Sequence, residues 1–410
     1  MKLRNDCDYI VKEAIQAVQP DAAVRRALSG RDFGPGRLVL VAAGKAAWSM
    51  ARAAYDCLNG RLSEGIVVTK YGHAQGPIGD LRIYEAGHPV PDDGTFSATK
   101  EALALVADLS EQDTVLFLLS GGGSALFESP LLPAEDLQAL TGQLLSSGAD
   151  IIEMNTIRKR LSAVKGGRFA QHCAPARVFT IVLSDIIGDP LDMIASGPAY
   201  PDSSTCADAK RIVKKYGLTL PPRALELLDQ ETPKVLDNVD TLVTGSVREL
   251  CLAAAKACRD RGYEPVTLTN SLTCEAREAG AFLAAIARYH QDTDKPLAFL
   301  AGGETVVHLS GTGKGGRNQE IALSAAEGIA GLPGTAVFSV GSDGTDGPTD
   351  AAGGFVSGET RSELLAQGAD IFDTLRENNA YHALSLCGGL IITGATGTNV
   401  NDVAVVLIDR

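Results

Sequence analysis

Three consecutive glycines, flanked by serines, follow an apolar run and could bind an anion. Thr114 to Leu119 is apolar, and Ser120-Gly121-Gly122-Gly123-Ser124 comes directly after it. We interpret this stretch as a buried strand, a glycine turn and the start of a helix. Glycines let the backbone approach a ligand because no Cβ atom blocks it, and a helix start offers free N–H groups and a positive dipole end. These five residues are therefore predicted to cradle a phosphate or a carboxylate, although the pattern also suits a plain strand-to-helix turn.

A second glycine loop, from Gly311 to Gly316, carries its own positive charges. Lys314 lies within it and Arg317-Asn318 follow it. Arginine can hold a phosphate or a carboxylate with two parallel hydrogen bonds. The glycines also spell the dinucleotide-binding pattern G-x-G-x-x-G, but that fingerprint has no cations in its turn and needs an acidic residue about 20 positions later. The cations favour a phosphate-rich ligand, with Lys314, Gly316, Arg317 and Asn318 as binding residues; the alternative is a flexible hairpin with solvated charges.

Carboxylates follow two of the expected strands. Asp185 and Asp189 come after one strand, and Asp343, Asp346 and Asp350 come after another. Mg²⁺ is typically held by one or two carboxylates together with phosphate oxygens. We predict that at least one of these residues serves a magnesium ion, although Asp-Gly pairs also form ordinary turns.

Lys45 follows Gly44 at the expected start of a helix. A cation there opposes the helix dipole, so an anionic ligand would stabilise it; a solvated lysine is the alternative. Asn155 and Arg158 share one face of a later helix at i, i+3 spacing. Arg158, Lys159 and Lys165 form a basic stretch that is more typical of a solvated surface than of a site. His88, on a proline-rich turn, could reach a ligand or support the fold.

Strand and helix patterns alternate along the whole chain, which predicts a doubly wound α/β architecture with ligands at the carboxyl ends of the strands. We place a domain boundary near 236, giving an N-terminal domain of residues 1–236 and a C-terminal α/β domain of 237–410. The first domain is expected to have strands at 37–43, 66–69, 81–84, 114–119 and 178–183, and helices at 6–28, 95–109, 134–147, 149–163 and 204–216. The second is expected to have strands at 241–244, 265–268, 296–301, 305–309, 335–340 and 390–394, and helices at 246–261, 274–290 and from 317.

Composition excludes several classes of function. The formal net charge of −13 argues against nucleic acid and anionic membranes as partners. No apolar run approaches the ~18 residues of a membrane span, and the N-terminus lacks the apolar core of a signal peptide. The eight cysteines form no C-x-x-C pair, as expected for free thiols in a reducing compartment. We expect a cytoplasmic protein. No P-loop motif or G-x-S-x-G motif is present.

A series of motifs from Gly44 to Asp402 resembles the type II glycerate kinases, the glycerate 2-kinases with a C-terminal MOFRL domain. The motifs that carry the resemblance are Gly44-Lys45-Ala46, Gly87-His88-Pro89-Val90-Pro91, Leu119 to Ala125, Glu153 to Lys159, Lys165-Gly166-Gly167, Leu183-Ser184-Asp185, Ala195-Ser196-Gly197-Pro198, Gly302-Gly303-Glu304-Thr305, Gly315 to Glu320, Asp343 to Asp350 and Thr398 to Asp402.

The resemblance implies a Rossmann-like N-terminal domain, a smaller α/β C-terminal domain with the MOFRL region at about 296–405, and a cleft between them. It implies ATP- and Mg²⁺-dependent phosphorylation of D-glycerate to 2-phosphoglycerate. Lys45 and Arg317 are then the catalytic cations, and Gly44 and Glu304 contribute to binding. Mg²⁺ would be held by Asp185, Asp189 or Asp343. Replacing Arg317 with alanine is expected to cut turnover severely with little loss of stability.

Several alternatives stay open. The triple glycine could hold the phosphate of ATP or the carboxylate of glycerate. An NAD(P)H-dependent hydroxypyruvate reductase would act on the same carbon skeleton, and a non-catalytic metabolite-binding protein would bind without turnover. The sequence is also compatible with a homo-oligomer.

Overall fold

The computed structural model describes residues 1–410 and divides into two compact units. The N-terminal unit comprises Val24–Leu183 and Asp189–Thr244, and the C-terminal unit comprises Met1–Ala23, Ser184–Gly188 and Gly245–Arg410. This division differs from the predicted boundary near 236 in three places, one of them the short segment Ser184–Gly188. The first residues of the chain belong to the C-terminal unit, and the later boundary falls after residue 244.

Two elements explain the different division. Helix α1 (Lys2–Ala17) presents its apolar stripe to α11 (Val247–Asp260), so it packs in the core of the C-terminal unit. Strand β6 (Val239–Gly245), expected to open the second domain, instead lies beside β5 in the first sheet. The predicted single helix over 6–28 is also interrupted, because Pro20 begins a separate helix α2 (Pro20–Leu28) and proline cannot donate an N–H bond.

The sheet of the N-terminal unit has the strand order β3-β2-β1-β4-β5-β6, and the pairings from β3 to β5 are parallel. The doubly wound architecture was predicted, and ligands in such sheets bind where the strand order reverses. The reversal lies between β1 and β4. The strands are β1 (Leu38–Ala43), β2 (Glu64–Lys70), β3 (Arg82–Ala86), β4 (Thr114–Leu119), β5 (Arg177–Leu183) and β6.

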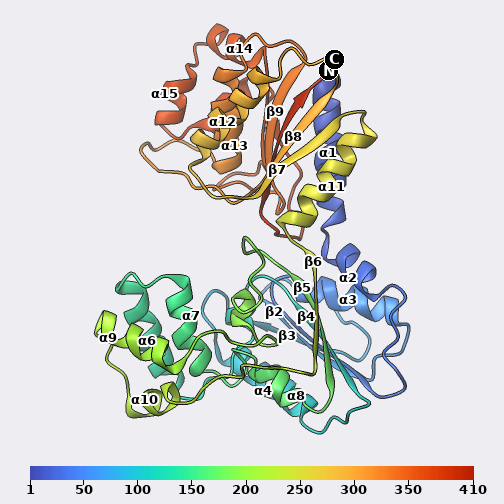
Figure 1. Ribbon diagram of the computed structural model, residues 1–410, viewed down its shortest axis with the longest axis vertical. Coiled ribbons are helices and arrows are strands. Elements are labelled where there is room, and N and C mark those ends of the chain that lie inside the picture. Colours follow the sequence, from blue (N-terminus) through green and yellow to red (C-terminus); the bar gives the residue numbers. More distant parts are fainter. The chain divides into compact units, whose positions relative to one another are not determined.

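The helices of this unit fall into two groups in Figure 1. The helices near the sheet are α3 (Ala47–Leu58), α4 (Asp93–Val106), the one-turn α5 (Gly123–Leu126) and α8 (Arg168–Cys173). A separate helical group with its own leucine-rich core consists of α6 (Ala134–Ser146), α7 (Ile151–Arg160), α9 (Cys206–Tyr216) and α10 (Pro222–Leu228). A 3-10 turn, η1 (Ile194–Ser196), contacts both α5 and α7.

The sheet of the C-terminal unit is mixed, with the order β11-β10-β9-β12-β8-β7. Only β7 and β8 pair in parallel; the other neighbours are antiparallel. The strands are β7 (Glu264–Leu272), β8 (Leu297–Gly303), β9 (Thr335–Gly341), β10 (Gly353–Ser357), β11 (Leu390–Ile391) and β12 (Asp402–Ile408). The strand expected at 305–309 was wrong: this segment makes one isolated bridge, from Val306 to Glu275, and otherwise lies outside the sheet.

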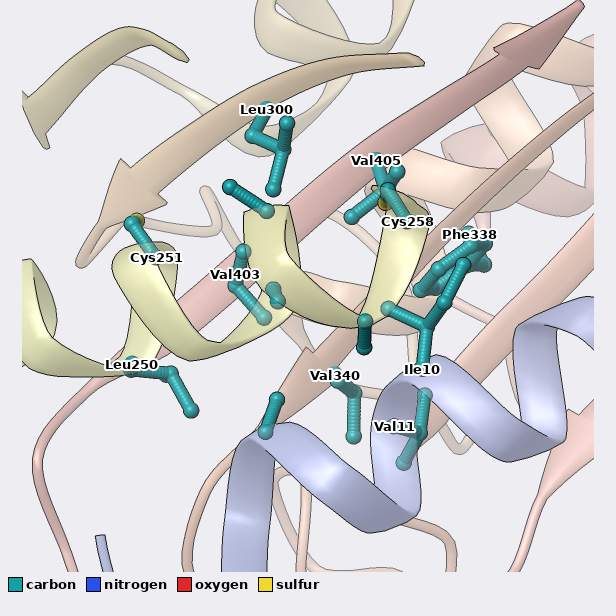
Figure 2. Close-up of a cluster of buried hydrophobic side chains, with 14 of the residues drawn as sticks. Ile10, Val11, Leu250, Cys251, Cys258, Leu300, Phe338, Val340, Val403 and Val405 are labelled. Atoms are coloured by element: carbon teal, nitrogen blue, oxygen red, sulfur yellow. The ribbon is translucent and has the colours of Figure 1, made fainter. Parts of the chain in front are cut away.

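Strand β12 is buried on both faces and separates two cores. Val403, Val405 and Leu407 pack with α1 and α11, as Figure 2 shows for part of this cluster. Ala404, Val406 and Ile408 face the other core. The helices of that second face are α12 (Ala276–Tyr289), α13 (Arg317–Gly328), α14 (Thr360–Ala366), α15 (Ile371–Arg376) and α16 (Ala380–Leu386). No helix in the structure combines the length and apolar character needed to cross a membrane.

Candidate functional site

The turns that follow β1 and β4 are bonded to each other at the reversal of the strand order. The N–H of Lys45 donates to the carbonyl of Gly121 at 2.9 Å, and the N–H of Ala46 donates to Ser120 Oγ at 3.1 Å. A Cβ atom on Gly44 would collide with Ser120, and Gly44 has φ 127°. Only glycine suits this position. Ser120 therefore anchors the Gly44–Ala46 turn, and its hydroxyl is already used inside the protein.

The centre of the triple glycine remains open. The N–H groups of Gly121 and Gly122 have no hydrogen-bond partner, whereas that of Gly123 donates to the Ser120 carbonyl at 3.2 Å. A Cβ atom built on Gly122 would lie 3.2 Å from Lys45 Cγ and 3.1 Å from His88 Nε2. Two free amides, a lysine and a histidine thus surround Gly122. These are groups that bind an anion.

Two cations of the N-terminal unit, one of them beside Gly122, lack carboxylate partners. The side chains of Lys45 and Arg158 are only partly buried and make no hydrogen bond or ion pair in the structure. His88 is also without a partner, and burial, followed by the charges of Lys45 and Lys70, lowers its pKa. The unpaired Lys45 makes the surroundings of Gly122 positive in the absence of ligand, which favours an anionic ligand.

Asn155 and Ser124 belong to one buried network behind the loop. Ser196 Oγ donates to Asn155 Oδ1 at 3.0 Å and lies 3.1 Å from Ser124 Oγ. Ser196 and its neighbour Ala195 have φ of 63° and 50°, a region that costs non-glycine residues of order 1–3 kcal/mol and often occurs at functional sites. These contacts make Asn155 and Ser124 residues that shape the loop.

The interpretation of Lys159 and Lys165 as a solvated basic surface was wrong. Lys159 is buried and pairs with Asp202 at 3.1 Å. Lys165 is fully buried, pairs with Glu128 at 3.1 Å, and donates to the carbonyls of Ser124 and Phe127 at 2.8 and 3.1 Å. Burial lowers the pKa of Lys165, and Glu128 opposes this. Lys165 therefore donates hydrogen bonds to the Ser124 carbonyl of α5 and to the Phe127 carbonyl directly after it. These bonds hold the short helix that follows the triple glycine.

Arg317 occupies the first turn of α13 in the C-terminal unit and is held by two acidic residues. Its Nε and Nη2 donate to the two oxygens of Asp402 at 2.6 and 3.1 Å, and its Nη1 donates to Glu304 at 2.8 Å. Burial lowers the pKa of Arg317, but the bonds and charges of Asp402 and Glu304 outweigh it and raise the pKa. Burial raises the pKa of Asp402 to about 6. Arg317 is thus a paired and oriented cation.

The N-terminus of α13 already binds a carboxylate of the protein. Asp346 accepts hydrogen bonds from the N–H groups of Asn318 and Gln319 at 3.2 and 2.9 Å and from both side-chain amides. A Cβ atom on Gly316 would collide with Asp346, so this glycine permits the approach. The predicted anion site at this helix start is therefore filled by Asp346. Asn318 is buried and holds Asp346 in place.

The glycine loop from Gly311 to Gly316 is packed against the chain, which makes the flexible-hairpin interpretation wrong. Gly313 N–H donates to the Glu377 carbonyl at 2.8 Å, and Gly311 N–H donates to Asn378 Oδ1 at 2.9 Å. Lys314 is exposed, and its ammonium lies 4.4 Å from the centre of the Tyr381 ring. The loop borders a pocket of about 760 Å³, which Arg317 and Asp343 also line.

The three carboxylates predicted to bind metal are distributed over both units. Asp185 and Asp343 belong to the C-terminal unit and Asp189 to the N-terminal unit. Neither unit gathers three or more His, Cys, Asp or Glu side chains that could hold a metal ion by themselves. Asp189 Oδ1 is buried without a hydrogen-bond partner and has φ 51° at its backbone. An orphaned carboxylate oxygen is suited to a cation, and Mg²⁺ needs only one or two carboxylates beside phosphate oxygens.

Comparisons with known proteins identify the family of the chain. The family model described as a domain of unknown function, DUF4147, matches residues 6–229, and the MOFRL family matches residues 297–402. A relative named D-glycerate 2-kinase, from Thermotoga maritima, is 53% identical over 97% of both chains. The chain belongs to the glycerate kinase family with a C-terminal MOFRL domain. A Pyrococcus horikoshii relative named glycerate 2-kinase is 40% identical and covers 97% of this chain and 96% of its own.

The structure of this family member also resembles a solved glycerate kinase. The crystal structure of the Thermotoga maritima enzyme matches with a TM-score of 0.95, at 52% identity, over 99% of both chains. The α/β fold with a C-terminal MOFRL domain is thereby confirmed.

Sequence reasoning located both loops but missed the carboxylates that occupy one of them. Asp402 was seen only as part of a motif, and Asp346 only as a metal candidate. Asp346 and Asp402 contact α13 although both are distant from it in sequence. No local sequence pattern indicates such a pairing. Gly316, directly before Arg317, is a local signal that could have indicated a close approach at the helix start.

Proposed function

We propose that this protein is an ATP-dependent D-glycerate 2-kinase that forms 2-phosphoglycerate. The observation that carries the proposal is the unpaired Lys45 and the free amides around Gly122, at the reversal of the strand order. Both substrates are anions, through the phosphates of ATP and the carboxylate of glycerate. Membership of the glycerate kinase family supports the same assignment. As a kinase that uses ATP, the protein is proposed to work in the cytoplasm.

The N-terminal unit contributes an anion cradle in this proposal. Gly121 and Gly122 donate their free N–H groups to an anionic oxygen, and Lys45 and Arg158 neutralise its charge. Phosphoryl transfer depends mainly on positioning and charge neutralisation. Lys45 is catalytic because its ammonium is unpaired and can follow the charge that develops on the transferred group.

The C-terminal unit contributes a fixed cation. Asp402 and Glu304 hold the Arg317 guanidinium in one orientation, so little reorganisation is needed during the reaction. Its two-pronged bond to Asp402 leaves the group oriented toward the bordering pocket, where an oxygen of the substrate could join it. Lys314, on the exposed rim of that pocket, is assigned at most an accessory contact with the nucleotide.

Mg²⁺ is proposed as the ion that accompanies ATP. Asp189, with its orphaned oxygen, is the first choice of ligand, and Asp185 and Asp343 are the others. When bound, the ion would neutralise charge on the phosphate groups. The chain's own contribution is the carboxylate that orients it.

A coupled assay tests the proposal. The protein is incubated with D-glycerate, ATP and MgCl₂, and the products are separated as 2- and 3-phosphoglycerate. Formation of 2-phosphoglycerate is expected. A parallel incubation with hydroxypyruvate and NADH tests the reductase alternative, and oxidation of NADH with no phosphoglycerate formed would overturn the kinase assignment. Binding of glycerate with no turnover in either assay would favour a metabolite-binding protein.

A further inference from the structure

His88 lies beside the open part of the triple-glycine loop with both ring nitrogens unpartnered. Its Nε2 is 3.1 Å and its Cδ2 is 3.0 Å from a Cβ atom built on Gly122, and Lys45 Cγ is 3.2 Å from the same point. The ring and the lysine stem therefore border the same small space above Gly122. Most histidines near other side chains find a hydrogen-bond partner; His88 makes none in the structure.

The groups around His88 keep its ring neutral. Burial and the charges of Lys45 and Lys70, with a further contribution from His73, lower the pKa of His88 below its usual value of 6.5. The two carboxylates nearest along the chain are Glu85 and Asp92, and Asp92 is engaged by Tyr71 Oη at 2.9 Å and by the Thr95 N–H at 3.0 Å. Glu85, on the adjoining strand β3, accepts from the Ala74 N–H at 2.9 Å. Neither acid contacts the imidazole, so nothing stabilises a charged ring.

We propose that His88 is the general base that accepts the proton of the glycerate hydroxyl during phosphoryl transfer. This inference rests on the proposed kinase function. As the substrate oxygen bonds to the γ-phosphorus of ATP, the bond from that phosphorus to the bridging oxygen breaks and its electron pair leaves with ADP. The hydroxyl proton passes to the lone pair of His88 Nε2, in the tautomer that carries its hydrogen on Nδ1. The imidazolium then releases the proton to water.

Lys45, Ser120 and Ser124, the other polar groups at this loop, are unsuited to the role. The ammonium of Lys45 has no lone pair and is suited to neutralise charge. The hydroxyl of Ser120 accepts the Ala46 N–H, and Ser124 belongs to the buried network with Ser196. A neutral imidazole in a positive, anion-binding site combines an available lone pair with attraction for the anionic substrate. Its proton, once accepted, is destabilised by Lys45 and Lys70 and so leaves readily.

The pH dependence follows from the direction of the pKa shift. Because the pKa of His88 is lowered, the ring is in its basic form at pH 7 and activity persists into mildly acidic solution. Turnover should fall when the pH drops through that lowered pKa and the ring becomes charged. A variant without a base at this position should turn over slowly, and its turnover should no longer fall at acidic pH.

The experiment compares wild type with His88→Gln and His88→Asn, which keep polarity and remove the base. General bases typically contribute 10²- to 10⁴-fold, so kcat with D-glycerate and ATP should fall at least 100-fold, with a smaller change in KM. In both variants, kcat should become independent of pH between pH 5 and 8. The control is His172→Gln, an exposed histidine of α8 whose Nε2 contacts the Leu103 carbonyl at 3.1 Å; it should retain wild-type kcat.

The outcomes separate the two proposals. Absence of kinase activity in wild type would overturn the proposed function itself. With an active wild type, a kcat within about threefold in both His88 variants would overturn the role of His88 alone. A large fall in kcat that keeps the acidic limb of the pH profile would also overturn it, since that pattern indicates a structural effect. Thermal unfolding of each variant identifies any loss of folded protein.

Discussion

The two glycine loops look alike in sequence and differ in electrostatic state. At the triple glycine of the N-terminal unit, Lys45 has no acidic partner, and two amides are free. At the Gly311–Gly316 loop of the C-terminal unit, Arg317 is bound by Asp402 and Glu304. Asp346 fills the helix start that follows. The triple-glycine loop can therefore bind an external anion, whereas Arg317 and the helix start after the Gly311–Gly316 loop are already paired with carboxylates of the protein.

This difference assigns different tasks to similar residues. An unpaired cation contributes little to folding and is available to a ligand. A paired cation contributes to folding and is held in a defined orientation, which lowers the cost of reorganisation during a reaction. Glycine therefore has two structural roles in these loops. It leaves room for a ligand at Gly122, and it leaves room for the protein's own carboxylate at Gly316.

The largest effect on turnover is expected for Lys45→Met. The change removes the charge and keeps the apolar stem that lies against Gly122. Loss of a group that stabilises developing charge typically costs 10²- to 10³-fold in kcat, and the melting temperature should stay within about 1 °C because the ammonium has no partner to lose. Steady-state kinetics and thermal unfolding measure the two quantities.

Lys100→Met is the matched control for Lys45→Met. Lys100 is an exposed lysine of α4 in the same unit, and its ammonium also makes no hydrogen bond or ion pair. It should leave kcat and melting temperature unchanged. If Lys45→Met destabilised the protein while retaining its kcat, the description of Lys45 as a free, catalytic cation would fail.

Arg317→Met should reduce kcat about 100-fold and also destabilise the protein. Its sequence context suggested that stability would hardly change, but the structure shows that removal leaves Asp402 buried and unpaired. Breaking a buried pair costs about 3–5 kcal/mol, and the partial exposure of Arg317 lowers our expectation to about 2 kcal/mol. Urea unfolding measures the difference, and Arg361→Met, which breaks the exposed pair with Glu327, should cost under about 1 kcal/mol.

The stability deficit of Arg317→Met should depend on pH. Burial raises the pKa of Asp402 to about 6 in wild type, and loss of Arg317 should raise it further. A carboxyl group with a raised pKa favours the folded state at low pH, and this contribution is lost as the pH rises through the folded-state pKa. The difference in free energy of unfolding between wild type and Arg317→Met should therefore become smaller as the pH falls from 8 to 5. A difference that stays constant over this range would contradict the assignment of the deficit to Asp402.

Much of this contrast depends on contacts that local sequence cannot reveal. Apolar runs that end in glycine identified β1, β4 and the turns at their carboxyl ends, because buried parallel strands have a strong local signature. The placement of α1 was missed, since its partner α11 lies more than 200 residues further along the chain. Asp346 and Asp402 were missed as partners of α13 for the same reason. Lys165 looked solvated because its buried partner, Glu128, is distant in sequence.

Asp346→Asn tests whether the built-in anion stabilises α13. The carboxylate accepts from two backbone and two side-chain N–H groups, and an asparagine would offer one acceptor and place an NH₂ group against N–H donors. An unsatisfied buried group costs about 1–3 kcal/mol. We therefore expect the free energy of unfolding, measured with urea, to fall by about 2 kcal/mol. Binding of a phosphate analogue at the helix start should not appear in the variant, since the remaining amide still fills that space.

Lys314→Met should have the smallest effect, and this small effect separates the two loops most clearly. The ammonium is exposed and lies over the Tyr381 ring, an arrangement worth about 0.5–1 kcal/mol at the surface. Lys314 also lowers the pKa of Asp350, though less than the hydrogen bond from Tyr381 Oη does. We therefore expect kcat to change less than threefold, because the internal carboxylates already complete this loop. A KM for ATP raised more than tenfold would instead make Lys314 a phosphate ligand, and the C-terminal loop would then resemble the open loop around Gly122.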